Sequence, residues 1–521
     1  MLWEYFSLIG PGLLMLAAAL AFARPGLRPG PVPRLAELAA LGALFSSVVS
    51  SAAIFGPAPL DLQPALASLL WLDGVSACML LLVSFVGWVV LRYSRSYLDG
   101  EQRQDAFTGW MCSTLAGVLI LVQAGHWLLF IAAWIGVSMS LHQLLVFYPQ
   151  RPGARRAAHK AFLTARASDA ALAGAAIILW QQSSTSHLEQ LSTWATTAPS
   201  SGWTLTAACL IATAAILRSA QFPAHGWLTE VMETPTPVSA LLHAGVINAG
   251  GFLLIRLADS MLLAPGVLAV LAMVGGFTAV FGGLVMLTQP AVKTSLAWST
   301  VAQMGFMILQ CGLALFPLAL LHILAHSLYK AHAFLVSGGA VENVAAIARP
   351  GPIAVPSGKA VGRAFILALT IYALVATAFG LEGKSPQAIA LGAILIFGVA
   401  YLLAQGLADK APKVLTQRTA LYSVAAAVGY FALQRGIEAL LAGNLPAPPA
   451  PGPLEWAVLV VLVICFAVVA VAQAMFPLWS DHPAAAGLRV HLNNGLYANA
   501  LLDRMLRSWR PQPTMTQRDA A

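Results

Sequence analysis

Apolar runs of about 20 residues follow one another along the whole chain, and each is long enough to cross roughly 30 Å of hydrocarbon as a helix. Of the 521 residues, 59% are hydrophobic and only 9% are Asp, Glu, Lys or Arg. A soluble domain carries about 25% charged residues, so this chain could not cover itself with a surface that suits water. The alternating ten-residue segments of a β-barrel are absent, which leaves helices to satisfy the backbone in lipid. The sequence therefore predicts an all-α polytopic membrane protein with about fifteen transmembrane helices.

The apolar runs also predict where these helices lie, and one run is too long for a single straight span. That run, 203–233, contains Pro223, which removes a backbone donor and interrupts a helix, so we expect a broken helix there. The expected helices are 4–23, 35–56, 73–92, 108–124, 127–148, 161–180, 203–233, 236–258, 262–287, 294–315, 317–343, 364–381, 386–407, 415–435 and 455–476.

Most of the 28 lysines and arginines lie in loops that follow odd-numbered helices, or in the C-terminal tail. This set includes the segment from Arg151 to Arg166, and only Lys384 and Arg435 fall in loops after even-numbered helices. Cytoplasmic loops collect basic residues, so we expect the N-terminus outside and the C-terminus in the cytoplasm. The net charge of +8 then needs no nucleic-acid partner. The N-terminus lacks a basic start, so we expect the first helix to be retained rather than cleaved.

The end of the chain combines a proline-rich linker with an amphipathic tail. Residues 444–454 predict an external linker before the last helix. From His491 to Trp509, Leu492, Leu496, Ala500 and Asp503 share one face and Leu501, Leu502, Met505, Leu506 and Trp509 form an apolar one. Such a stretch lies on the membrane, docks on a cytoplasmic partner, or is a surface helix without a partner.

Ionisable residues inside the membrane are costly, and we treat each one as a candidate functional residue. Arg218 stands just before the break at Pro223, where freed backbone groups and a charge together are typical of an ion site. Glu230 or Glu233 could neutralise Arg218, and the sequence does not say which. His243 and Asn248 follow in the next span.

A polar stripe predicts a proton path through two later helices. His322, His326 and Lys330 are spaced by four residues and so share one helix face. Ser295, Ser299 and Gln303 repeat this spacing after Lys293, while His332 lies off the stripe. Histidine and a desolvated lysine both exchange protons near neutral pH. The alternative is that these side chains join helices by hydrogen bonds. The five cysteines lie in apolar runs without metal-ligand spacing, so we expect no metal site and no cofactor.

These residues carry a family resemblance. The segment from Arg218 to Leu228 (RSAQFPAHGWL), PTPVSALLHA from Pro235, KTSLAWSTVAQMGFM from Lys293, and the His322, His326, Lys330 spacing resemble the proton-antiporter membrane family. That family includes subunits L, M and N of respiratory complex I and the large Mrp antiporter subunits. Leu72-Asp73-Gly74 and Tyr93 with Tyr97 resemble the N-terminal region of subunit L. The resemblance implies inverted five-helix repeats with a broken helix, and a central chain of Lys, His and Glu that conducts protons.

The same resemblance implies a division of the chain and gives roles to its residues. Arg218 takes the place of a broken-helix lysine, and Lys293, His322, His326 and Lys330 become central-axis residues. The implied parts are N-terminal transmembrane helices at 1–107, a first repeat at 108–258, a second repeat at 259–410, C-terminal transmembrane helices at 411–476, and a cytoplasmic amphipathic tail at 477–521.

The departures from the family pattern concern the first repeat. The family's fifth-helix glutamate is missing, since Trp134-Ile135-Gly136 stands there. Arginine does not deprotonate in proteins, so Arg218 can be a fixed charge or gate but not a proton carrier. We expect no long lateral helix like that of subunit L, because little sequence follows the fifteenth expected helix. Lys384 could match a lysine of a second broken helix, although little chain follows it.

One branch of the family matches better. The run from Met232 to Phe252, with Glu233 and Asn248, is similar to DabB-type membrane subunits of the Dab inorganic carbon transporters. The similarity implies a prokaryotic inner-membrane protein in a heterodimer with a large cytoplasmic DabA-like subunit that resembles a zinc β-carbonic anhydrase. The pair would accumulate bicarbonate from CO2 on a gradient of H⁺ or Na⁺, and this chain would be a transporter subunit rather than an enzyme. The competing hypotheses are a respiratory or Mrp antiporter subunit and a non-conducting membrane anchor.

Overall fold

The computed structural model describes residues 6–23, 30–56, 68–338, 356–380, 384–407 and 412–505. In these ranges the regular secondary structure is helical, and two isolated β-bridges join Leu70 to Ala124 and His126 to His187. Twelve of the described helices are long and apolar enough to span a membrane. The all-helical membrane architecture is therefore confirmed, while the count of fifteen spans stays a prediction.

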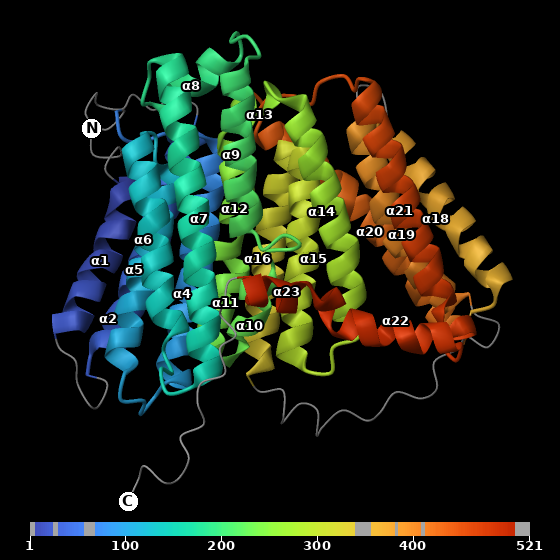
Figure 1. Ribbon diagram of the computed structural model, residues 1–521, viewed down its shortest axis with the longest axis horizontal. Coiled ribbons are helices and arrows are strands. Elements are labelled where there is room, and N and C mark those ends of the chain that lie inside the picture. The colour runs from blue at the N-terminus through green and yellow to red at the C-terminus, as the bar shows by residue number, and fades with distance from the viewer. Residues whose placement is uncertain are drawn as a thin grey trace, which may run out of the picture.

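The N-terminal part is a bundle of helices that run alternately up and down (Figure 1). Its elements are α1 (Phe6–Ala23), α2 (Val32–Ile54), α4 (Gly74–Tyr97), α5 (Gln104–Gln123), α6 (Trp127–Leu145), α7 (Pro152–Ser183) and α8 (Leu188–Ala195). Asp73 begins α4 with a capping box, because its carboxylate accepts from the Ser76 amide at 2.8 Å while the Ser76 hydroxyl accepts from the Asp73 amide.

Helix α7 begins nine residues earlier than the sequence predicts, which corrects the expected loop. Arg155, Arg156, Lys160 and Arg166 lie within the helix and not in a connection. The physical reason is local, since Pro152 occupies the first turn, where its missing amide costs nothing, and helix-forming residues follow it. Two of these cations, Lys160 and Arg166, become part of the candidate site.

The central part contains two interrupted spans. Its elements are α9 (Gly202–Arg218), α10 (Gly226–Glu230), α11 (Thr236–Ala244), α12 (Ala249–Arg256), α13 (Ala258–Leu262), α14 (Pro265–Met286), α15 (Val292–Gly312) and α16 (Phe316–Ser337). The interruption expected near Pro223 is present between α9 and α10. The expected helix near 236–258 is present as one candidate span, Thr236–Arg256, and a 3₁₀ turn at Val246–Asn248 interrupts it between α11 and α12. The Ser219 hydroxyl donates to the Ile247 carbonyl at 3.1 Å, so the two interruptions lie side by side.

Helices α14 and α15 pack with their backbones in close approach. A Cβ on Gly305 would lie 2.5 Å from the Ala279 amide nitrogen, and one on Gly275 would lie 2.4 Å from the Leu309 amide nitrogen. Small residues at a membrane helix interface allow this approach and the dispersion contacts that come with it. The pair holds Ser299, Thr300 and the other polar residues of α15 in a fixed position.

The C-terminal part forms a second bundle with its own apolar core. Its elements are α18 (Gly358–Ala378), α19 (Pro386–Gly406), α20 (Lys413–Leu440) and α21 (Pro453–Trp479), followed by α22 (Pro483–Asn493) and α23 (Ala498–Met505). Residues 446–452, most of the predicted proline-rich linker, connect α20 to α21 without helix. Figure 1 shows α22 and α23 running across the lower part of the molecule, from α21 toward α10 and α11.

The tail differs from the continuous amphipathic helix that the sequence predicts. A turn at Gly495–Tyr497 separates α22 from α23, and Leu496 and Tyr497 have positive φ values of 51° and 61°. Leu506 and Trp509 of the predicted apolar face lie outside the described residues.

Two described loops that carry basic residues lie on the same side of the molecule. The α4–α5 connection, with Arg103, and the α6–α7 connection both lie at the lower edge in Figure 1. The Arg103 guanidinium donates to the Phe147 carbonyl at 2.7 Å and joins the two connections. We call this edge the basic side.

Candidate ion path

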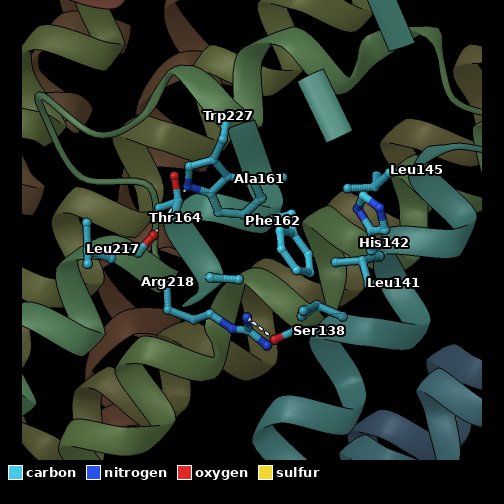
Figure 2. A pocket seen from close by; sticks show the side chains of 12 residues that line it. Ser138, Leu141, His142, Leu145, Ala161, Phe162, Thr164, Leu217, Arg218 and Trp227 are labelled. Carbon is cyan, nitrogen blue, oxygen red and sulfur yellow. Dashed lines mark hydrogen bonds between the residues drawn. The ribbon is translucent and has the colours of Figure 1, made fainter. Parts of the chain in front are cut away.

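Arg218 ends α9 at the helix break and is almost completely buried. Its guanidinium donates to the Ser138 hydroxyl at 2.5 Å (Figure 2). It also donates to the Trp134 carbonyl at 3.4 Å. The guanidinium carbon also lies 4.9 Å from the centre of the Trp134 ring, a cation–π contact. Helix α6 therefore holds Arg218 with a hydroxyl, a carbonyl and a ring.

The expected pairing of Arg218 with Glu230 or Glu233 is wrong. Glu230 contacts Lys160 instead, with 2.9 Å between the ammonium and the carboxylate oxygen, and Glu233 is exposed beside Gly153. The carboxylate whose charge acts on Arg218 is Asp169 of α7. The direction of α10 after the helix break explains why Glu230 does not pair with Arg218. Helix α10 continues from the interruption toward the basic side and carries Glu230 to Lys160.

The sequence analysis missed Asp169, which forms an ion pair with Arg166 at 2.7 Å one turn earlier on the same helix. The signal was present as an oppositely charged pair three residues apart in an apolar helix. It went unread because Arg166 was assigned to a loop.

A second buried cluster forms around His243, where α11, α15 and α16 meet. The His243 ring nitrogen Nδ1 lies 3.0 Å from the Thr300 hydroxyl, and its ring stacks on Phe334 with 4.3 Å between centres. His326 Nε2 lies 3.2 Å from the His243 carbonyl oxygen. The Lys330 ammonium donates to the Leu296 carbonyl at 3.0 Å. The structure therefore brings His243, His326 and Lys330 together in the interior.

Lys330 is a buried cation without a carboxylate partner among the described residues. Its ammonium has three donors, and the one hydrogen bond in the described part goes to the Leu296 carbonyl. A charged group held this way is expensive, and stability alone does not account for it.

Two further predicted residues extend the cluster along α16. The Asn248 amide donates to the Ser327 hydroxyl at 2.9 Å, which ties the 3₁₀ turn to α16. The His322 and His326 rings stack with 5.8 Å between their centres. His322 also faces a cavity of 470 Å³ together with Ser299 and Gln303, two residues of the predicted second stripe. Helices α14, α15, α16, α19 and α21 line this open cavity.

Other predicted residues lie away from this cluster. Lys293 is half-buried in the first turn of α15, and the Ser295 hydroxyl donates to the Met286 carbonyl at 3.4 Å. His332 is exposed. Lys384 precedes α19, with its ammonium 5.0 Å from the centre of the Phe431 ring. Helix α19 runs without interruption, so the expected match of Lys384 to a second broken helix is wrong.

Among the described residues, no group of three or more His, Cys, Asp or Glu side chains is placed to hold a metal ion. Both clusters consist of buried polar and charged side chains inside the helical bundle.

Two family models match the chain over the part that contains both clusters. The model "NADH:quinone oxidoreductase/Mrp antiporter, TM" matches residues 124–349. The model "NADH-Ubiquinone oxidoreductase (complex I), chain 5 N-terminus" matches residues 66–108.

Among known proteins, the "Probable inorganic carbon transporter subunit DabB2" of Halothiobacillus neapolitanus is 37% identical over 486 residues. The match covers 91% of this chain and 86% of that relative. The chain belongs to the DabB family. A second DabB subunit, from Hydrogenovibrio crunogenus, is 46% identical over 276 residues, which are 52% of each protein.

The DabB chain is also similar to respiratory and antiporter proteins, at lower coverage. NADH-quinone oxidoreductase subunit L of Escherichia coli is 34% identical over 52% of this chain and 44% of its own length. The solved structure of an Mrp complex from Dietzia sp. matches with a TM-score of 0.62 and 21% identity, over 100% of this chain and 61% of that chain. The last match shows that the two proteins share a fold. The family assignment rests on the match to the DabB2 subunit.

Proposed function

We propose that this chain is the energy-coupling membrane subunit of an inorganic carbon transporter, and that it conducts cations, foremost protons, through its buried polar clusters. The observation that carries the proposal is the contact of His243 with His326, beside a Lys330 that has no carboxylate partner in the described part of the chain. The DabB relatives are named as probable inorganic carbon transporter subunits, and we take inorganic carbon as the transported substrate from those names.

The second cluster provides a route on which a proton can be exchanged. Histidine rings accept and donate protons near neutral pH, and a desolvated lysine gives up its proton far more readily than one in water. Lys330, His326 and His322 follow one another along α16, and His322 reaches the 470 Å³ cavity. In this proposal the proton moves along α16 between Lys330 and that cavity.

Arg218 has a different role in the first cluster. Because its guanidinium stays charged, Arg218 acts as a fixed positive charge at the helix break and sets the electrostatic barrier there. The Ser138 hydroxyl holds it in place, and the charge of the Asp169 carboxylate offsets its own. Glu230 then belongs to the support of the break, and Glu233 and Lys293 lie near the basic side, where cations enter or leave.

The remaining parts of the proposal concern topology and partners. We propose about fifteen spans in inverted five-helix repeats, with the repeats at 108–258 and 259–410, in a prokaryotic inner membrane. The basic side faces the cytoplasm by the positive-inside rule. There the chain binds a large soluble zinc-containing subunit related to β-carbonic anhydrases, and CO2 hydration belongs to that subunit.

Alanine substitutions on α16 test the cation path. We expect Lys330→Ala and His326→Ala to abolish inorganic carbon accumulation in cells while the protein still assembles in the membrane. His332→Ala is the matched control, since His332 lies on the same helix but is exposed. Accumulation that survives in both buried variants would refute the path.

A second candidate, an antiporter-like subunit of a respiratory or Mrp complex, is favoured by the match to subunit L. Affinity purification in a mild detergent separates the two functions. A single large zinc protein in the eluate supports the carbon transporter, and flavin or iron–sulfur subunits support the respiratory complex.

A further inference from the structure

Lys160 joins two segments that are far apart in the sequence. Its side chain is 0% exposed, and its ammonium lies 2.9 Å from the Glu230 carboxylate of α10. It also lies 2.9 Å from the Asn499 side-chain oxygen and forms an ion pair with Asp503, both on α23. An ammonium has three donors, and these three acceptors match them.

Helix α23 also fits α10 by shape. The Asn499 amide contacts the Glu230 carboxylate, so the two partners of Lys160 bind each other. A Cβ on Gly226, the first residue of α10, would lie 1.7 Å from the Asn499 side-chain oxygen, so the Asn499 side chain packs directly against the α10 backbone. The tail is therefore seated on the broken helix itself.

Helix α10 in turn forms one wall of the cavity beside Arg218. Trp227 of α10 lines this cavity together with Ser138, Ala161 and Arg218 (Figure 2). The Trp227 ring nitrogen donates to the Leu217 carbonyl at 3.2 Å, across the helix break. The cavity has a volume of 30 Å³, which is room for about one or two water molecules. A small displacement of α10 would change how much water reaches Arg218.

We propose that Lys160, Asn499 and Asp503 form a latch through which the C-terminal segment positions α10 and controls the access of water to Arg218. The proposal rests on the proposed cation path, in which Arg218 is the fixed charge of the first cluster. The three latch residues are positioning residues, because they act on Arg218 through α10. The latch is closed in this structure and opens during the transport cycle.

Thiol labelling tests the control of water access, in the full-length chain in inverted membrane vesicles. The five native cysteines are replaced, and Ala161→Cys places one reporter thiol in the cavity wall. We expect Asp503→Ala to raise the labelling rate with a charged maleimide by about tenfold or more, since losing one partner of a buried ion pair shifts a closed–open equilibrium at least that far. Asp503→Glu keeps the charge and should stay within about twofold of the parent. An equal rate in Asp503→Ala and the parent would overturn the latch.

A reversible cross-link tests the opening. The Cγ atom of Asn499 lies 2.5 Å from the position of a Cβ on residue 226. The Asn499 Cβ is therefore within about 4 Å of that position, which suits a disulfide. We expect Gly226→Cys with Asn499→Cys to lose carbon uptake when oxidised and to regain it on reduction, while each single variant ignores the oxidant.

Full uptake in the oxidised double variant would overturn the opening of the latch. The labelling experiment needs no transport, so it separates a failure of the latch from a failure of the proposed cation path. If labelling changes as expected but no variant conducts cations, the latch stands and the proposed function fails.

Discussion

We expect the buried charge of Lys330 to lower the free energy of unfolding, and a substitution of Lys330 tests this expectation. Lys330→Met keeps most of the side-chain volume and removes the charge. A charged side chain at the centre of a membrane helix costs about 2.5–3.5 kcal/mol on insertion scales, so this cost disappears in the variant. The substitution also removes the hydrogen bond to the Leu296 carbonyl, and a hydrogen bond to a charged group contributes about 1.5–3 kcal/mol. We expect the variant to be more stable than the parent by about 1 kcal/mol and inactive in carbon accumulation.

Arg256→Met is the control, because Arg256 is an equally buried cation with a carboxylate partner. Its guanidinium lies 2.8 Å from the Asp73 carboxylate, and its side chain is 1% exposed. Breaking such a pair leaves the Asp73 carboxylate without its cation in the membrane interior and should cost about 3–5 kcal/mol.

The assay is reversible unfolding of the purified protein in mixed micelles, followed at increasing SDS fractions. The two variants should move the free energy of unfolding in opposite directions. If Lys330→Met destabilises the protein as much as Arg256→Met does, the reasoning that Lys330 lacks a compensating partner is refuted.

Two further predictions follow from the contacts of the first cluster and the α14–α15 interface. Asp169→Asn and Arg218→Gln should each lower the free energy of unfolding in the same assay. The double variant should lose about 1–3 kcal/mol less than the sum of the two single losses. If the losses are strictly additive, the two charges do not interact. Gly305→Val should abolish assembly in the membrane, because its Cβ would meet the α14 backbone, whereas Gly283→Ala, which meets nothing within 4 Å, should leave the yield unchanged; equal yields would contradict the close packing of these helices.

The sequence by itself determined the membrane class, the positions of most helices and the break near Pro223. These features depend on local composition, because hydrophobic length and a missing backbone donor act within one segment. It also determined that His322, His326 and Lys330 share a helix face, since helix geometry alone fixes that relation.

Tertiary structure decided which of these polar residues meet. Arg218 binds Ser138 and Trp134 of α6, and Glu230 binds Lys160, although the sequence places Glu230 close to Arg218. The 3₁₀ turn at Val246–Asn248 could not be predicted from the sequence either, since the turn contains no proline.

The tail gives the clearest example of what only the fold decided. Asp503 reaches Lys160 across more than three hundred residues. The sequence pattern placed Asp503 on one face of the tail and showed no partner for its charge. The spacing of residues within one helix shows which side chains share a face. The partner of that face depends on how distant helices pack, and packing is a property of the assembled bundle.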